Sequence, residues 1–255
     1  KRTGADAIKL QTYTPSTMTI DHDNSHFQIN EGTLWDGKTL FELYGEAHTP
    51  WEWHETLFKV AKEEGLICFS SPFDLTAVDF LEELDVPAYK IASFEIQDIP
   101  LIEYVASKMK PIIMSTGIAE LEDIELAVAT CRKAGNNNII LLKCTSSYPA
   151  PLDLANLNTI KDLKTRFGVE VGFSDHTYGV LAPSVAVALG AKVVEKHFIL
   201  NKSIGGPDAD FSLDENEFTE MVKAIRDTEK LLGKVSYNVA GKVKKNRKFT
   251  RSLFI

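Results

Sequence analysis

Cysteine, long apolar runs and excess basic charge are all scarce in this chain of 255 residues. Its three cysteines, Cys68, Cys131 and Cys144, never form a CxxC pair, which predicts reduced core thiols in a cytoplasmic protein. No apolar run approaches the roughly 18 residues of a membrane span, and we expect no signal peptide. A formal net charge of -8 argues against a nucleic-acid partner, because such binding needs a basic face. The remaining composition, 44% hydrophobic and 25% charged, is typical of a globular enzyme.

Strand and helix patterns alternate along most of the chain. Short runs rich in Ile, Val and Leu predict seven strands, at residues 7–13, 66–71, 88–93, 111–117, 139–145, 169–176 and 192–200. Amphipathic patterns predict helices at residues 52–64, 75–84, 100–108, 121–134, 160–167, 181–189 and 216–232. Apolar strands that alternate with helices indicate a parallel sheet buried on both faces.

We therefore expect an α/β fold, a (β/α)8 TIM barrel in residues 1–233 without its first strand. Residues 1–4 look like the last turn of a helix, which would place that strand upstream. The segment 14–51 is long for a connection and is predicted to be a lid over the barrel. Residues 234–255 are predicted to be a linker. A doubly wound sheet is the alternative fold.

Polar side chains gather where these strands are predicted to end, which is where barrel enzymes carry their chemistry. His176 and His197 end two adjacent strands, and two neutral imidazoles so placed can share one divalent metal ion. Lysines and hydroxyls at the other strand ends suit a phosphate, because they supply charge and donors. Taken singly, each of these residues is more often a cap, a turn residue or a surface charge. Lys90 is also a candidate Schiff-base lysine.

At YKIASFEI, STGI, CTSSYPAP, GFSDHT, EKHF and GGPD the chain resembles the sialic acid synthase family, which condenses phosphoenolpyruvate with an N-acetylated amino sugar. The resemblance covers the whole chain, in family order and spacing. It implies a metal-dependent TIM barrel, C–O cleavage that releases phosphate, and a homodimer formed through a C-terminal antifreeze-like domain. Residues 247–255 resemble the entrance to that domain, so we expect this chain to stop short of it.

The resemblance also implies roles for individual residues. Phosphoenolpyruvate would be held by Lys9, Lys90, Ser71, Ser93, Ser115 and Ser174. The metal ligands would be His176 and His197, for Mn²⁺ first and Mg²⁺ or Co²⁺ as alternatives. The catalytic groups would be these two histidines with Lys90 and with Glu95 as acid or base. The amino sugar would contact Gln11, Ser146, Tyr148 and Asp208.

Three segments, TYTPSTMTID, LWDGKTLFELY and HTPWEWH, resemble the family branch that makes pseudaminic acid for bacterial surface glycans from 2,4-diacetamido-2,4,6-trideoxy-altrose. Ser146 stands where N-acetylneuraminate synthases tend to have asparagine. Trp35, Trp51 and Trp53 are expected either to pack against the apolar groups of that sugar or to pack the lid onto the barrel. The alternatives are an N-acetylneuraminate or legionaminate synthase, a non-catalytic phosphoenolpyruvate- or sugar-binding module, and a metal hydrolase.

Overall fold

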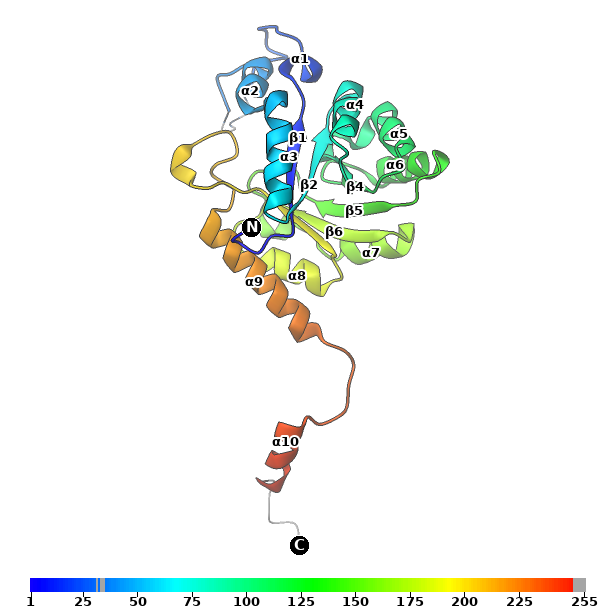
Figure 1. Ribbon diagram of the computed structural model, residues 1–255, viewed down its shortest axis with the longest axis vertical. Coiled ribbons are helices and arrows are strands. Elements are labelled where there is room, and N and C mark those ends of the chain that lie inside the picture. The colour runs from blue at the N-terminus through cyan, green and yellow to red at the C-terminus, as the bar shows by residue number, and fades with distance from the viewer. Residues whose placement is uncertain (31, 33–34, 250–255) are drawn as a thin grey trace.

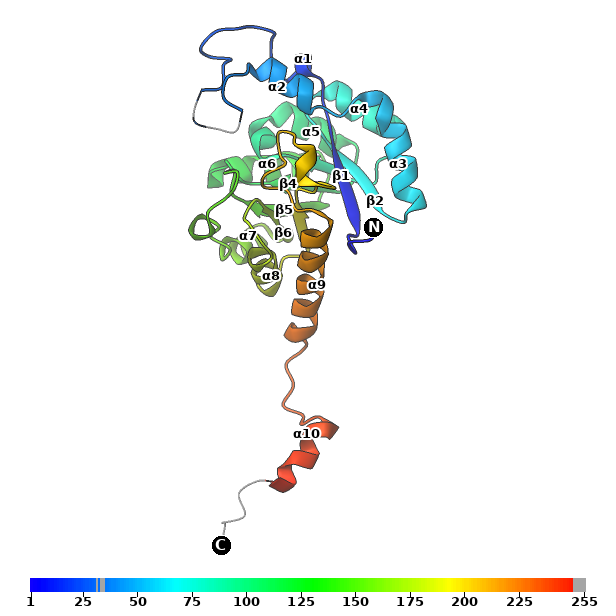
Figure 2. The same ribbon diagram turned by 90° about the vertical axis from the view of Figure 1, so that its left-hand side faces the viewer.

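The computed structural model shows seven parallel strands that curl into an open barrel, with helices on the outer face (Figures 1 and 2). The structure describes residues 1–30, 32 and 35–249. The strands are β1 (Ala7–Thr12), β2 (Ile67–Pro72), β3 (Tyr89–Ile91), β4 (Ile112–Ser115), β5 (Ile139–Cys144), β6 (Glu170–Asp175) and β7 (Val193–Lys196). They lie side by side in chain order, from β1 to β7. A doubly wound sheet would reverse its order at a switch point, so that alternative is wrong and the barrel prediction is confirmed.

Helices connect the strands and cover the outside of the sheet (Figure 1). They are α3 (His54–Glu63), α4 (Leu75–Glu83), α5 (Ile99–Ser107), α6 (Leu121–Lys133), α7 (Thr159–Phe167), α8 (Leu181–Ala188) and α9 (Glu215–Leu232). Their ends follow local chemistry: Asp74 caps α4 by accepting from the backbone N–H groups of Thr76 and Ala77, and α7 stops at Gly168, which takes φ +63°. The described residues also form five short 3₁₀ turns: η1 (Trp51–Trp53), η2 (Ser93–Gln97), η3 (Leu152–Leu154), η4 (Lys202–Ile204) and η5 (Arg247–Phe249).

Two apolar cores form, one on each face of the sheet. The larger lies between the strands and the helices, and includes buried side chains such as Tyr89, Met114, Leu141 and Phe173 from the strands. The smaller fills the barrel interior with Phe69, Ile113 and Leu142. Successive side chains of a strand point to opposite faces, so both cores draw on the same strands.

The connection between β1 and α3 differs from the predicted lid. It contains two helices, α1 (Pro15–Met18) and α2 (Leu40–Ala47), rather than continuous loop. The Thr39 side chain accepts from the backbone N–H of Glu42, and the Glu42 side chain reaches back to the N–H of Thr39. This capping box, Thr-x-x-Glu, was readable in the sequence and marks the start of α2.

The last strand and the first residues of the chain also differ from the prediction. β7 stops at Lys196, before the predicted end at residue 200, because the backbone then joins a different segment: Leu213 N donates to the carbonyl of His197 at 2.9 Å. Residues 1–4 form a turn rather than the end of a helix, closed by Gly4 N donating to the carbonyl of Lys1. β1 and β7 are the two edges of the sheet within the described residues.

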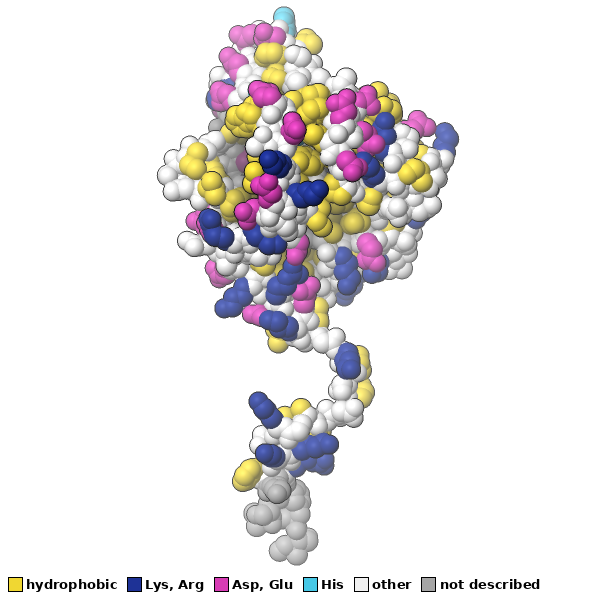
Figure 3. Space-filling view, in the orientation of Figure 1, with side chains coloured by type: hydrophobic (Ala, Val, Ile, Leu, Met, Phe, Trp, Pro, Cys, Tyr) yellow, Lys and Arg dark blue, Asp and Glu magenta, His cyan; other side chains and the backbone are white. Residues whose placement is uncertain are grey.

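Beyond α9, an exposed stretch leads away from the barrel to the short helix α10 (Gly241–Asn246), as Figure 1 shows. The predicted linker thus contains a helix, and its residues 250–255 lie outside the described part of the chain. On the face of the barrel seen in Figure 3, acidic and basic side chains are interspersed. Among the described residues, we find no helix with the length and apolar character needed to cross a membrane.

Candidate active site

The strand register brings the predicted polar residues to the inner face of the barrel. Gln11 pairs with Ser71, Lys90 with Ile113, Ser115 with Leu142, and Ser174 with Glu195. Paired residues of parallel neighbours point to the same face, and Ile113 and Leu142 belong to the inner core. The inner face is therefore apolar toward the amino-terminal ends of the strands and polar toward their carboxyl ends.

Glu195 is the centre of the polar layer. Its Oε1 lies 3.0 Å from Lys9 Nζ on β1 and 3.9 Å from Lys90 Nζ on β3. The Ser174 hydroxyl, on the neighbouring strand, donates to the same oxygen at 3.0 Å. Through this one carboxylate, β7 is joined to three other strands, β1, β3 and β6. The carboxylate also holds the ammonium groups of the two lysines in the barrel interior.

Burial and charge act against each other in this layer. Burial alone would raise the pKa of Glu195, but Lys9 and Lys90 outweigh that effect and lower the pKa to about 2. Burial lowers the pKa of Lys90 to about 8, although the carboxylate of Glu195 favours its charged form. Two ammonium groups face one carboxylate here, so this group of three side chains has a net positive charge that favours binding of an anion.

Serine hydroxyls also belong to this polar layer. Lys90 Nζ donates to Ser115 Oγ at 2.7 Å, and Gly117 N donates to Ser93 Oγ at 3.1 Å. Among the described residues, Ser71 Oγ is buried and has no hydrogen-bond partner. A buried hydroxyl left without a partner costs stability, so its place beside Gln11 on the inner face fits a group that bonds to a ligand.

His176 and His197 stand one residue beyond the last paired rung of β6 and β7. Their ring centroids are 5.4 Å apart. His176 Nδ1 lies 2.9 Å from the carbonyl oxygen of Thr145, and His197 Nδ1 lies 3.2 Å from Asp208 Oδ2. Both partners only accept, so each neutral ring carries its proton on Nδ1 and keeps the lone pair of Nε2 for a ligand.

The pair of imidazoles fits a divalent metal ion that takes its remaining ligands from substrate or water. Both rings have the orienting contact at Nδ1 that metal-bound histidines usually show. Within the described ranges, no group of three or more His, Cys, Asp or Glu side chains is arranged to hold an ion. Two imidazole ligands would leave the remaining coordination positions of such an ion open to substrate or water.

An aromatic wall lines one side of the two histidines. The ring of Tyr148 lies 4.3 Å from that of His176, and the ring of Phe211 lies 5.1 Å from that of His197 and 5.2 Å from that of Tyr148. Asp208 Oδ2 contacts Nδ1 of the same His197. Tyr148 and Asp208, both predicted sugar contacts, therefore lie directly beside the predicted metal ligands.

Glu95 lies in η2, just after the end of β3. One of its carboxylate oxygens, Oε2, is buried and has no hydrogen-bond partner among the described residues. Burial raises the pKa of Glu95 to about 7, although Lys90 favours the charged form. A carboxyl group with a pKa near neutrality can both donate and accept a proton.

A family model covers most of the chain. The model of the NeuB family matches residues 1–237. The chain belongs to the NeuB family.

Relatives of this NeuB-family chain include two enzymes named pseudaminic acid synthase. The one from Campylobacter jejuni is 50% identical over 254 residues, which cover 100% of this chain and 74% of the relative. The one from Helicobacter pylori is 50% identical over 256 residues, covering 100% of this chain and 75% of the relative. The crystal structure of N-acetylneuraminic acid synthetase from Leptospira borgpetersenii, in complex with citrate, aligns with a TM-score of 0.82 at 29% identity, over 98% of this chain and 82% of that one.

The three tryptophans have different surroundings in the structure. The Trp51 ring stacks on Phe80 of α4 with centroids 4.7 Å apart, so it packs the connection onto the barrel. Trp53 is exposed. The Trp35 indole N–H donates to the carbonyl of Pro207 at 3.0 Å. That bond ties the β1–α2 connection to the loop that carries Asp208, so Trp35 reaches the edge of the candidate site.

Sequence reasoning assigned no role to four residues that lie in the site of this NeuB-family chain: Glu195, Gly117, Phe211 and Cys144. The alternation of Val193, Glu195 and His197 places Glu195 on the same face as the histidine, which is a usable signal. No sequence signal marks Gly117 as a site residue. The structure does, because a Cβ at this position would overlap Ser146 Oγ and lie 2.7 Å from Ser93 Oγ. Cys144 Sγ lies 3.8 Å from His176 Nδ1.

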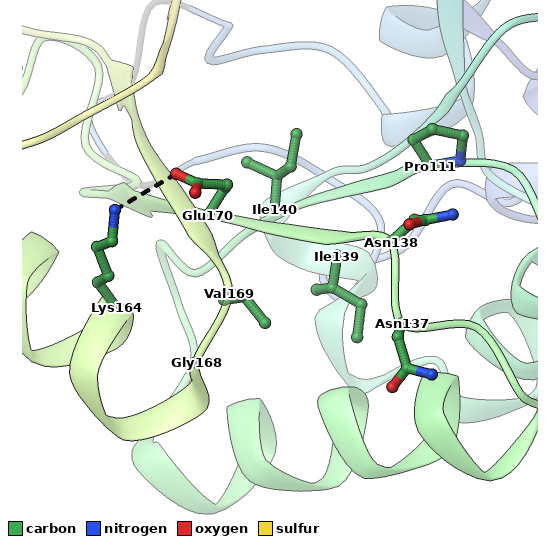
Figure 4. Close-up of a pocket in the computed structure, with 9 residues that line it drawn as sticks. All are labelled: Pro111, Asn137, Asn138, Ile139, Ile140, Lys164, Gly168, Val169 and Glu170. Atoms are coloured by element: carbon green, nitrogen blue, oxygen red, sulfur yellow. Dashed lines mark ion pairs between the residues drawn. The ribbon is translucent and has the colours of Figure 1, made fainter.

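A hollow lies at the other end of the barrel. Figure 4 shows it among the amino-terminal ends of β5 and β6, with Lys164 paired to Glu170 at 3.5 Å on one side of it. Chemistry in this fold occurs at the carboxyl ends of the strands. We therefore assign the hollow no part in the candidate site.

Proposed function

We propose that this protein is a pseudaminic acid synthase, which condenses phosphoenolpyruvate with 2,4-diacetamido-2,4,6-trideoxy-altrose and releases phosphate by C–O cleavage. One observation carries the proposal: two ammonium groups and several hydroxyls form a layer one rung before two histidines, on the same inner face. Among the described residues, no hydrogen bond involves the Nε2 atom of either histidine. The two pseudaminic acid synthases at 50% identity support the choice of sugar.

In this proposal the polar layer binds phosphoenolpyruvate. Lys9 and Lys90 neutralise its phosphate and carboxylate, and the hydroxyls and the backbone around them donate to the remaining oxygens. The serines that take part are Ser71, Ser93, Ser115 and Ser174. Glu195 orients both lysines before the substrate arrives, so less of the binding energy is lost in ordering them.

His176 and His197 would hold a divalent ion, with Mn²⁺ first and Mg²⁺ or Co²⁺ as alternatives. When bound, the ion supplies Lewis acidity toward the aldehyde oxygen of the open-chain sugar. The Thr145 carbonyl and Asp208 fix the orientation of the two rings. The reaction consumes one water molecule: C3 of phosphoenolpyruvate bonds to the aldehyde carbon, water adds to C2, and the C–O bond to the phosphate then breaks. Glu95, with its pKa near neutrality, exchanges a proton with the reacting groups.

The sugar would lie between the histidines and the mouth, against Tyr148 and Asp208, with Gln11 and Ser146 as further polar contacts. Tyr148 and Phe211 offer ring surface to the methyl and acetamido groups of a deoxy sugar. Trp35 holds the loop of Asp208 in place. This arrangement favours a sugar that presents apolar groups to one side of the site.

We extend the proposal to the whole protein as follows. Residues 1–233 form the synthase domain and 234–255 a linker toward a C-terminal domain, through which a homodimer forms. The NeuB match to residues 1–237 and the greater length of the relatives support these boundaries. The protein works in the cytoplasm, with small-molecule substrates and neither nucleic acid nor membrane as a partner.

The test is phosphate release from phosphoenolpyruvate by the full-length protein with Mn²⁺. The altro-configured diacetamido sugar, its legionaminate-type isomer and N-acetylmannosamine are offered in parallel. We expect release with the altro sugar alone, abolished by a chelator. Release with one of the other sugars would move the assignment to a legionaminate or N-acetylneuraminate synthase. Binding of phosphoenolpyruvate without release from any sugar would favour a binding module.

A further inference from the structure

The last rung between β6 and β7 carries a buried ion pair that the proposed chemistry does not use. Asp175 ends β6, Lys196 ends β7, and the two residues are register partners. Lys196 Nζ lies 2.7 Å from Asp175 Oδ2, and both side chains have an exposed fraction of 0%. Taking two charges out of water costs about as much as their attraction returns, so stability alone is a weak reason for such a pair.

This rung faces outward, and the rungs on either side of it face the barrel interior. Ser174 and Glu195, one residue earlier, are joined by a hydrogen bond of 3.0 Å. His176 and His197, one residue later, bring their rings to 5.4 Å. The ion pair therefore sits on the two residues that immediately precede the two histidines.

The same two side chains also hold the backbone on the far side of His176. Thr177 N donates to Asp175 Oδ1 at 2.8 Å, and Lys196 Nζ donates to the carbonyl of Thr177. His176 is thus enclosed between two residues that are fixed to each other and to β7. The strand pairing ends at Asp175 and Lys196, so this pair is the last cross-strand restraint before the imidazoles.

We propose that Asp175 and Lys196 are positioning residues that set the separation of the His176 and His197 imidazoles and thereby the affinity for the divalent ion. The inference rests on the proposed metal site. Groups that orient metal ligands without touching the metal typically change its affinity by roughly 10–100-fold when they are removed. Neither residue touches substrate, so the effect passes through the histidines.

The test is the double substitution Asp175→Asn with Lys196→Met in the full-length protein. It removes both charges together, which avoids an unpaired buried charge and leaves an amide oxygen to accept from Thr177 N. We expect the metal-free protein to melt near the parent temperature. We expect the Mn²⁺ dissociation constant, read from the electron paramagnetic resonance signal of the free ion, to rise about 10-fold or more. The visible absorption of bound Co²⁺ should change in position or intensity, because it reports ligand geometry without turnover.

A matched control removes a different ion pair at the other end of the barrel. Lys110 precedes β4 and lies 2.8 Å from Glu82 of α4. The substitutions Glu82→Gln with Lys110→Met should leave Mn²⁺ affinity and the Co²⁺ spectrum unchanged. Asp175→Asn with Lys196→Gln, which leaves both positions uncharged and able to form hydrogen bonds, gives the same readouts should the first double variant fail to fold.

The outcomes separate this inference from the proposed function. A parent that binds Mn²⁺ and a folded double variant that binds it equally, with the same Co²⁺ spectrum, would overturn the positioning role alone. An equal loss of affinity in the Glu82 and Lys110 control would also overturn it, because the effect would then be general. A parent that binds no Mn²⁺ would overturn the metal site and this inference with it.

Discussion

The outer and inner faces of the sheet bury different chemistry. The outer face packs large apolar side chains against helices, with Leu141 and Phe173 almost fully buried. The inner face has a small apolar base around Phe69 and then a layer of lysine, glutamate and serine. Burying charge is unfavourable unless it is paired. The inner face therefore contributes little to the stability of the fold, which comes mainly from the apolar packing on the outer face. Substitutions on the two faces should therefore separate stability from activity.

The largest effect is expected from His197→Ala on the inner face. It removes one of two proposed metal ligands, and phosphate release should fall by about 10³-fold or more while the melting temperature changes little. His26→Ala is the matched control, because His26 is exposed on the β1–α2 connection. A His197→Ala variant with most of the parent activity would remove the distinction between the faces.

The outer face should show the opposite behaviour. Leu141→Ala leaves a cavity in the core between sheet and helices, and should lower the free energy of unfolding by about 2–5 kcal/mol. Activity per folded molecule should stay within a few-fold of the parent. Leu126→Ala, at an exposed position of α6, should change the unfolding free energy by less than ~0.5 kcal/mol in the same denaturant titration. Loss of activity in a folded Leu141→Ala protein would contradict the assignment.

Gly117→Ala should produce a smaller, local effect at the mouth of the inner face. The added Cβ would meet the hydroxyls of Ser146 and Ser93, and these must shift away. We expect the KM for phosphoenolpyruvate to rise about 10-fold, the equivalent of ~1.4 kcal/mol, with kcat less affected. Gly45→Ala in α2 is the control, since a Cβ there meets only Pro15 Cγ at 3.8 Å. An unchanged KM would show that the serines adjust without cost.

The smallest effect concerns pH and Glu195. Its folded-state pKa of about 2 lies below the ordinary value of 4.5, so its contribution to stability is present above pH 4.5 and is lost as pH falls toward 2. The difference in unfolding free energy between the parent and Glu195→Gln should therefore be largest above about pH 5 and shrink on acidification. Denaturant titrations of both proteins between about pH 3 and 7 measure it. A difference independent of pH would mean that the charge of Glu195 contributes nothing.

Much of this contrast was predictable from the sequence. Apolar runs separated by amphipathic helices predicted the parallel barrel, and the alternation along each strand placed Lys9 and Gln11 on one face. Lys90 and Ser93 stand three residues apart and share a site because β3 ends at Ile91, two residues before the predicted end of that strand. Parity holds wherever the strand continues, so the inner face could be read directly.

Other parts depend on contacts that no local pattern carries. Asp175 and Lys196 lie on outward positions, and only the packing of β6 against β7 pairs them away from water. Gly117 follows β4 and Ser146 follows β5, and their closeness depends on the conformations of two separate loops. The helix α2 was missed although Thr39 and Glu42 form its capping box, because the length of the segment favoured a lid instead.

The most direct test of the account is anomalous diffraction at the manganese edge from crystals of the full-length protein grown with Mn²⁺ and phosphoenolpyruvate. The account predicts one strong peak within bonding distance of Nε2 of both His176 and His197, with the phosphoenolpyruvate anion beside Lys90 and Ser115. A peak bound by other residues, or phosphoenolpyruvate bound away from the inner face, would contradict it.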